Sequence, residues 1–336
     1  MKTPDILSIG EPMVELCATS AGRLSVVEEF RRGWGGDTSN FAVATARLGG
    51  SAGYVCRLGG DEFGRSFLDL WRREGVDASR VIVEPDGFTA VYIISLTEGG
   101  SHDFTYYRAG AAASRYSPGD LDTEYVAKAK VLHTSGISLA VSGSLREASL
   151  EAMRVCREAG GMISFDVNMR PKLWALDAAR AGCGRAIGES DVVFASVEDT
   201  RTLYGVGEPD GAAEKLRSLG AGTAVIKRGG EGCHVSSEEE SFDSPSYSVD
   251  VVDTTGSGDA FDAAFMLGLL EDWEMEKSAA FANAVGALTA TGLGAVAPIP
   301  TREQALGLMD RPGRGRSQRL VAKSATKRAR TSPPMR

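Results

Sequence analysis

The chain has 336 residues, of which 43% are hydrophobic and 24% are charged, and its formal net charge is −8. This composition suits a globular protein with one large α/β domain or two smaller ones. No apolar run is long enough to cross a membrane, and the first ten residues do not form a signal peptide, so we expect a cytoplasmic protein without a membrane partner.

Short apolar runs and helical patterns alternate along most of the chain. Strands are predicted at 5–10, 91–97, 131–134, 162–167, 191–195 and 223–227, and helices at 39–48, 63–74, 144–159, 176–188 and 211–219. Several of these strands are continuously apolar, which is typical of strands buried on both faces. The pattern predicts an α/β fold whose mainly parallel central sheet is covered on both sides.

Two regions interrupt this alternation. Residues 12–34 and 88–116 have alternating or polar strand-like patterns without a long helix. They predict a small β-sheet outside the main layer, which could serve as a lid over a ligand cleft. A purely structural β-extension is the alternative.

The most informative stretch is DVVDTTGSGDAFDAAF at 250–265. A strand-like run leads into a turn with Gly256 and Gly258, and 259–270 predicts a buried helix that is apolar nearly all round. Backbone N–H groups of Gly256, Ser257 and Gly258 would form an anion site at the helix N-terminus. Asp259 could be a helix N-cap, but that does not explain the glycines. A general base beside an anion hole explains both, and predicts phosphoryl transfer to a hydroxyl.

The last 26 residues differ from the rest of the chain. Residues 311–336 hold nine Lys or Arg and no acid, so the preceding part carries 28 basic against 45 acidic residues. The segment is poor in apolar residues, and we expect a disordered tail after a folded domain at 1–310. A dispensable tail is the preferred interpretation, and nucleic-acid or membrane-surface binding is the alternative.

The stretch DTTGSGDAF resembles the C-terminal signature of the PfkB (ribokinase-like) carbohydrate kinase family. Upstream, GWGGDTSNFAVATARLGG and VCRLGGDEFGRSFLDLWRREGVD resemble the family's N-terminal signature, and the resemblance runs from about residue 5 to 302. It implies a three-layer ribokinase-like sandwich with a β-lid and an ATP-dependent sugar kinase that uses Mg²⁺. A homodimer or higher homo-oligomer formed through the lid is a further expectation.

The resemblance also assigns roles to individual residues. Asp259 is the implied catalytic base, with the amides of Gly256, Ser257 and Gly258 as the anion hole. The implied sugar-binding residues are Gly35, Gly36, Asp37 and Asn40, with Asp259. The implied nucleotide-binding residues are Asn168, Ser196, Lys227, Gly229, Gly230, Gly232, Gly256, Gly258 and Asn283. From the residues alone, Lys227 would be a solvent-facing strand end and Asn283 a polar group on a helix surface.

Ion sites are implied as well. The family's N-x-x-E motif falls at Ser196–Asp199, where Ser replaces Asn and Asp replaces Glu. Oxygen ligands remain, so Asp199 is expected to bind Mg²⁺ through water. The family resemblance places a monovalent cation, K⁺, near Asp253 and Thr255.

Three segments bear on the identity of the sugar. IGEPMVEL, HDFTYYRAGAAAS and DVNMRPKLW resemble 2-keto-3-deoxygluconate (KDG) kinases, which implicates Tyr106, Arg108 and Arg170 in substrate binding. Tyr92 and Tyr106 would supply hydroxyls and apolar ring faces to the sugar. Two arginines suit the carboxylate of an acid sugar. A fructokinase, or another kinase of a neutral sugar, is the alternative. A sugar or nucleotide sensor without catalysis is a third possibility, suggested only by the altered N-x-x-E motif.

Overall fold

The computed structural model describes residues 3–96, 102–310 and 318–320. Its largest element is a nine-stranded sheet in the order β15-β14-β13-β12-β11-β10-β9-β1-β4. Six neighbouring strands are parallel: β12 (Thr223–Lys227), β11 (Val192–Ser196), β10 (Met162–Asp166), β9 (Val131–Ser135), β1 (Ile6–Ile9) and β4 (Ala52–Val55). β13 (Cys233–Ser236), β14 (Ser241–Ser244) and β15 (Gln318–Leu320) extend one edge in antiparallel fashion.

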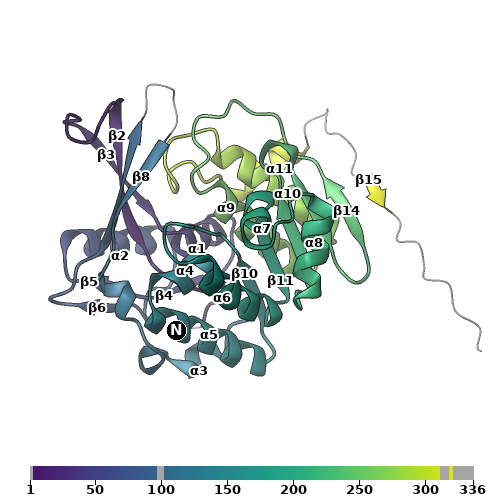
Figure 1. Cartoon of the computed structure of the whole chain (residues 1–336), viewed down its shortest axis with the longest axis horizontal. Helices are drawn as coiled ribbons and strands as arrows, with labels where there is room; N and C mark the ends of the chain where they lie inside the picture. The colour runs from purple at the N-terminus through teal and green to yellow at the C-terminus, as the bar shows by residue number, and fades with distance from the viewer. Residues whose placement is uncertain (1–2, 97–101, 311–317, 321–336) are drawn as a thin grey trace, which may run out of the picture.

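Helices cover both faces of this sheet (Figure 1). One layer contains α1 (Asp37–Arg47), α2 (Glu62–Glu74), α9 (Ser257–Leu270), α10 (Met275–Thr289) and α11 (Arg302–Met309). The other contains α3 (Thr123–Val126), α4 (Gly136–Val141), α5 (Gly143–Glu158), α6 (Leu176–Gly188), α7 (Val197–Tyr204) and α8 (Pro209–Ser218). Adjacent strand residues face opposite layers: Ile6 packs in the first core and Leu7 in the second. Burial on both faces explains the continuous apolar runs in the sequence.

A second sheet stands beside the main one, in the order β3-β2-β7-β8. Its strands are β3 (Phe30–Gly35), β2 (Met13–Ala21), β7 (Ala90–Leu96) and β8 (His102–Tyr107). β2 and β7 pair in parallel, and the two outer pairs are antiparallel. β5 (Arg57–Gly59) and β6 (Ile82–Glu84) form a separate short pair. The small sheet confirms the predicted excursion from the main layer.

The predicted strands and helices agree with the observed elements to within a few residues, and the three-layer α/β fold is confirmed. The last residue of the predicted strand 91–97 lies outside the described residues. Within the predicted disordered tail, residues 318–320 form β15 against the free edge of β14, and the other tail residues lie outside the described ranges. Among the helices of the described chain, none has the length and apolar character needed to cross a membrane.

Candidate active site

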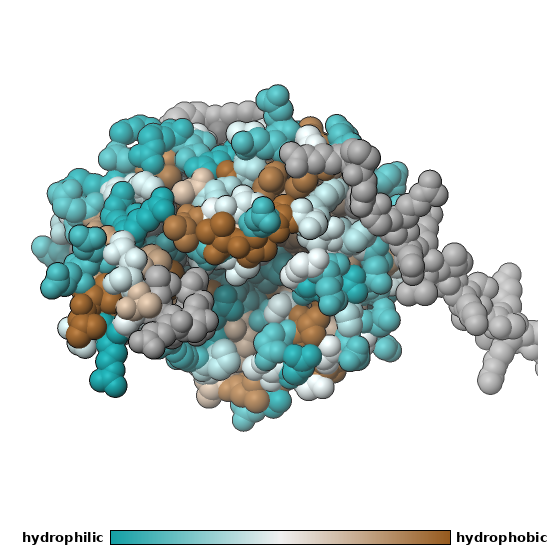
Figure 2. All heavy atoms as spheres, turned by 90° about the horizontal axis from the view of Figure 1, so that it is seen from above, coloured by the Kyte–Doolittle hydropathy of each residue, from teal (hydrophilic) through white to brown (hydrophobic). Residues whose placement is uncertain are grey.

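A cavity of about 720 Å³ opens where the parallel strands end. β10, β11 and β12 contribute their last residues, Asp166, Ser196 and Lys227, to its wall, as expected for a ligand site in a parallel α/β sheet. Seen from above, the surface is hollowed near its middle beneath a hydrophobic band (Figure 2). The predicted site residues in the cavity wall are Gly36, Asp37, Asn40, Tyr92, Tyr106, Asn168, Arg170, Ser196, Asp199, Lys227, Gly229, Thr255, Gly256, Gly258 and Asp259.

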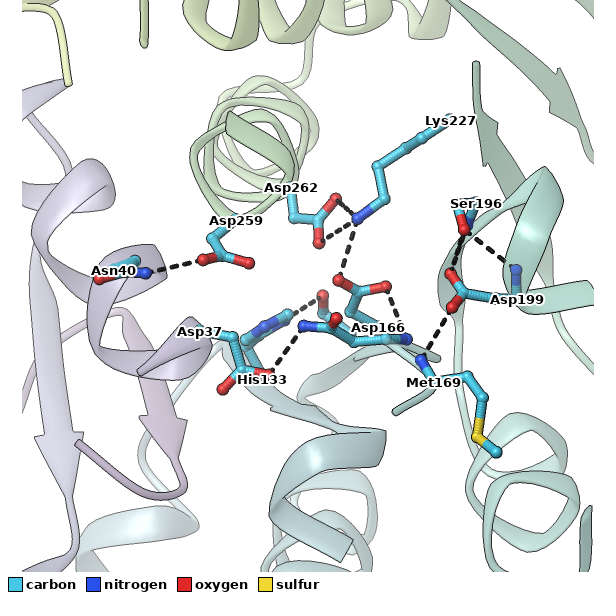
Figure 3. Close-up of polar contacts among 12 residues, drawn as sticks. Asp37, Asn40, His133, Asp166, Met169, Ser196, Asp199, Lys227, Asp259 and Asp262 are labelled. Atoms are coloured by element: carbon cyan, nitrogen blue, oxygen red, sulfur yellow. Dashed lines mark hydrogen bonds and ion pairs between the residues drawn. The ribbon is translucent and has the colours of Figure 1, made fainter. Parts of the chain in front are cut away.

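Asp259 and Asn40 meet across this cavity. Asp259 is the third residue of α9, and Asn40 lies in the first turn of α1. The Asn40 side-chain amide donates to Oδ2 of Asp259 at 2.8 Å (Figure 3). Burial, reinforced by the nearby Asp37 carboxylate, raises the pKa of Asp259 to about 7, against the lowering effects of Asn40 and Lys227. A carboxyl group with this pKa can take a proton at neutral pH.

The N-terminus of α9 differs from the expectation in two respects. Its N-cap is Gly256, at φ 78°, and Asp259 does not cap the helix. A Cβ on Gly256 would lie 2.4 Å from the Ala295 carbonyl oxygen, so only glycine fits. The Ser257 N–H donates to the Thr254 carbonyl at 3.2 Å, and the Ser257 residue is not part of the cavity wall. Of the three amides predicted for the anion hole, the Ser257 N–H is thus engaged within the turn, while Gly256 and Gly258 lie in the cavity wall.

Lys227 brings a positive charge to this helix end from β12. Its Nζ contacts Oδ2 of Asp166 at 2.9 Å and both carboxylate oxygens of Asp262 at 3.1 Å (Figure 3). A Cβ on Gly258 would lie 3.3 Å from this Nζ, which places the ammonium beside the predicted anion hole. Burial alone would lower the pKa of Lys227, but Asp166 and Asp262 hold it above its ordinary range. The interpretation of Lys227 as a solvent-facing strand end is therefore wrong.

Asn168 donates hydrogen bonds to two carboxylates of the cavity wall, those of Asp37 and Asp166. Its φ of 34° lies in the left-handed region, which asparagine tolerates better than most residues. Its side-chain amide donates to Oδ2 of Asp37 at 3.0 Å, and its backbone N–H donates to Oδ1 of Asp166 at 3.3 Å. The Thr38 N–H donates to the other Asp37 oxygen at 2.8 Å. Burial raises the pKa of Asp37.

Asp199 is held in a capping box at the start of α7. Its Oδ2 accepts from the Ser196 N–H and hydroxyl, each at 2.7 Å, and its Oδ1 accepts from the Met169 N–H at 2.8 Å. In return, the Asp199 N–H donates to the Ser196 hydroxyl at 3.0 Å. The Ser and Asp of the altered motif thus stabilise a helix end, and both carboxylate oxygens already have donors.

The small sheet contributes Tyr92 and Tyr106 to the wall. The Tyr92 hydroxyl donates to Oε2 of the buried Glu15 at 2.6 Å. A Cβ on Gly35 would lie 2.4 Å from the Tyr92 hydroxyl, so Gly35 makes room for this ring and is not itself in the wall. Arg108 also lies outside the wall, because its guanidinium pairs with the buried Glu11 carboxylate. Arg170, by contrast, lines the cavity.

Other predicted residues lie away from the wall: Gly230, Gly232, Asp253 and Asn283. Asn283 is buried in α10, and its amide donates to the Ser244 carbonyl at 3.0 Å, so it is not a polar group on a helix surface. A Cβ on Gly232 would lie 2.0 Å from the Ser244 carbonyl oxygen, so Gly232 permits a close backbone approach. Oδ1 of Asp253 accepts from the Thr255 N–H at 2.9 Å and hydroxyl at 2.7 Å, which folds the loop ahead of α9.

The buried carboxylates near the site that were not predicted include Asp166, Asp262 and Glu11. Each had a signal in the sequence. Asp166 follows the apolar run of β10, and Glu11 follows that of β1, at the sheet edge where ligands bind. Asp262 is the one charged residue within the apolar part of α9 after Asp259. A charged residue inside a buried helix needs a partner, which Lys227 supplies.

Comparison with known proteins agrees with this arrangement. Residues 3–302 match the pfkB family of carbohydrate kinases. The chain is 34% identical to "Fructokinase-1" of Oryza sativa subsp. japonica over 91% of this chain and 97% of the relative. It is 33% identical to "2-dehydro-3-deoxygluconokinase" of Thermoproteus tenax over 90% of this chain and 94% of the relative.

A similar solved structure is that of an E. coli protein described as a candidate Ribokinase II, in complex with ATP and Mg²⁺. It superposes with a TM-score of 0.85 at 25% identity, covering 91% of this chain and 99% of that one. The resemblance inferred from the two signatures is thereby confirmed. The chain belongs to the PfkB family of carbohydrate kinases and is a phosphotransferase that acts on an alcohol group.

Proposed function

We propose that the protein phosphorylates the terminal hydroxyl of an acid sugar of the KDG type with ATP. The observation that carries this substrate class is the position of Arg170, a residue of the same cavity wall as Asp259, Asn40 and Gly36, whose guanidinium donates to the Met169 carbonyl at 3.1 Å. A guanidinium suits a carboxylate because it offers paired donors. The relative from Thermoproteus tenax is named for the same sugar acid, 2-dehydro-3-deoxygluconate.

In the proposed reaction, the sugar lies between the small sheet and the N-terminus of α1. Asp259 removes the proton from the terminal hydroxyl, whose oxygen attacks the γ-phosphorus of ATP while the bond to the β-phosphate oxygen breaks. Asn40 orients the carboxylate of Asp259 through the 2.8 Å hydrogen bond. The α9 N-terminus and Lys227 stabilise the negative charge of the transferred group.

Mg²⁺ and ATP are proposed together, on the likeness to the E. coli structure that contains both. Among the described residues, no group of three or more His, Cys, Asp or Glu side chains is placed to hold a metal ion. Asp199 is committed to its capping box. Since Mg²⁺ keeps waters and takes ligands from nucleotide phosphates, an ion delivered with ATP suits this site better than a resident one. K⁺ near Asp253 and Thr255 stays a prediction, as does the homo-oligomer through the lid.

A fructokinase is the second candidate, and one observation favours it. The positive charge of Arg108 is already balanced by Glu11, so only Arg170 of the two predicted arginines faces the cavity. A neutral sugar would need neither of these two arginines. The fructokinase of Oryza sativa is as similar to this chain as the KDG kinase is.

A coupled ADP-release assay over KDG, 2-keto-3-deoxygalactonate, fructose, ribose and 5-keto-2-deoxygluconate tests the proposal. We expect the highest kcat/KM for KDG. Arg170→Ala should raise KM for KDG strongly and KM for fructose little, and Arg180→Ala, on an exposed face of α6, is the control. A preference for fructose that survives in Arg170→Ala would support the fructokinase, and ATP binding without ADP release for any sugar would support a sensor.

A further inference from the structure

A buried ion pair lies behind the sugar side of the cavity. Glu11 follows β1, and Arg108 follows β8. The Glu11 side chain is 0% exposed and that of Arg108 is 10% exposed, and the Arg108 guanidinium contacts the Glu11 carboxylate. Within the described part of the chain, neither Glu11 oxygen makes a hydrogen bond to any group other than this guanidinium. The two residues therefore depend on each other for charge compensation.

Glu11 and Arg108 each lie next to a residue of the cavity wall. The Glu11 carbonyl oxygen would lie 2.4 Å from a Cβ on Gly36, and Gly36 is in the cavity wall. The Arg108 guanidinium lies 5.8 Å from the ring centroid of Tyr106, which is also in the wall. Because an arginine side chain is long and flexible, Arg108 can turn past Tyr106 toward a carboxylate in the cavity.

Such a movement has a cost that depends on Glu11. An ionised Glu11 left behind would be a buried charge without a partner, which strongly destabilises a protein. The cost falls if Glu11 takes up a proton from solvent and becomes neutral. A neutral sugar gives Arg108 no reason to move, so it does not involve this exchange.

We propose that Glu11 is a positioning residue that sets the preference between acid and neutral sugars. It holds Arg108 behind the wall, and it accepts a proton when Arg108 leaves it for the substrate carboxylate. Binding of an acid sugar is thereby coupled to the uptake of one proton, and binding of a neutral sugar is not. This inference rests on the proposed function, because it requires an acid sugar as substrate.

The charged surroundings of Glu11 support this exchange. Burial raises the pKa of Glu11 to about 7, Arg108 opposes the shift, and Asp37 on α1 reinforces it. The Tyr54 hydroxyl on β4 is the other titratable group influenced by Glu11. When Arg108 leaves, its lowering effect on the pKa of Glu11 disappears, so the pKa rises and proton uptake follows near neutral pH. The affinity for an acid sugar should therefore fall as pH rises above 7.

The test is the ratio of kcat/KM for KDG to kcat/KM for fructose, measured between pH 6 and pH 9. Protonation of Asp259 and of ATP affects both sugars, so it cancels in the ratio, and the KDG carboxyl stays ionised throughout. We expect the wild-type ratio to fall above pH 7, toward about tenfold per pH unit. In Glu11→Gln, which mimics the protonated form, the ratio should be flat and higher at pH 8.5. Glu11→Asp should restore the slope.

Glu74→Gln is the matched control, because it breaks another Arg–Glu pair, between α1 and α2 and outside the cavity wall. It should keep the wild-type slope. Calorimetry of KDG binding to the wild-type protein in two buffers of different ionisation enthalpy gives the proton count without any variant, and we expect a value approaching one at pH 8.

Two results would overturn the inference while leaving the proposed function intact. They are a pH-independent wild-type ratio with efficient KDG turnover, and a slope that persists in Glu11→Gln. Calorimetry that shows no proton uptake on KDG binding has the same consequence, even if Glu11→Gln does not fold. Turnover of fructose with none of any acid sugar would overturn both proposals together.

Discussion

The side-chain amide of Asn40 donates a 2.8 Å hydrogen bond to the carboxylate of Asp259, although 219 positions separate the two residues in the chain. The contact joins the first turns of α1 and α9, which pack side by side on one face of the main sheet. It ties the proposed base to the strand–helix junction that carries Gly36 and Asp37, where the sugar is expected to lie. Binding of the sugar and activation of its hydroxyl thus share one hydrogen-bonded unit.

The first prediction concerns pH. Because the reaction needs the carboxylate form of Asp259, kcat/KM for a neutral sugar should rise with pH and level off above the pKa of Asp259, which burial raises to about 7. Initial rates of ADP release between pH 5.5 and pH 9 measure this profile. A profile with no inflection between pH 6 and pH 8 would contradict the assignment of this pKa to the base.

The second prediction concerns Asn40→Ala. The hydrogen bond from Asn40 lowers the pKa of Asp259, so its loss should move the midpoint of the pH profile upward, by about one pH unit for a typical bond to a charged group. KM for the sugar should rise as well. Asn283→Ala is the control, since it removes another buried asparagine whose partner, Ser244, is not part of the wall. It should affect stability but not the midpoint, and equal midpoints in all three proteins would refute the role given to Asn40.

The third prediction concerns Lys227→Met. The change leaves Asp166 and Asp262 buried together without a cation, which should reduce the free energy of unfolding by about 3–5 kcal/mol. Urea unfolding measures the loss. Lys277→Met, at an exposed position of α10, should cost less than about 1 kcal/mol.

The double variant Lys227→Met/Asp262→Asn should recover part of that stability, because it removes one of the stranded charges. If the double variant is less stable than Lys227→Met, the two carboxylates do not repel each other, and Lys227 does not have the charge-compensating role given to it here.

Much of the fold could be predicted from the sequence, because strands buried on both faces are continuously apolar and easily located. β10 and β11 are of this kind, and their ends mark the cavity. In α10 only Asn283 was assigned to a helix, and the bounds of the helix were not predicted: its apolar residues lie all round and give no amphipathic stripe, and no glycine-rich turn marks its start as in α9. β15 could not be foreseen, since its partner β14 comes from about 75 positions earlier in the chain.

Site residues that belong to a single sequence motif could be predicted. Contacts between residues far apart in the chain could not. Gly256, Gly258 and Asp259 are neighbours in the sequence, and the structure places all three in the wall. Lys227 was expected at the nucleotide loop, but its two carboxylate partners come from β10 and α9, and nothing local in the sequence links them. Arg108 was expected to face the sugar, and only the fold shows that Glu11 pairs with it.

The central claim is that Asp259 is the base for phosphoryl transfer, and Asp259→Asn tests it most directly. Gly256 caps α9 without help from Asp259, so the variant should fold. Since burial raises the pKa of Asp259 in the folded protein, the ionised form opposes folding above pH 4, and the variant should have a higher Tm than the wild type at pH 8. Its kcat in the ADP-release assay should fall by about 10²- to 10⁴-fold. A folded Asp259→Asn protein with near wild-type kcat would contradict the claim.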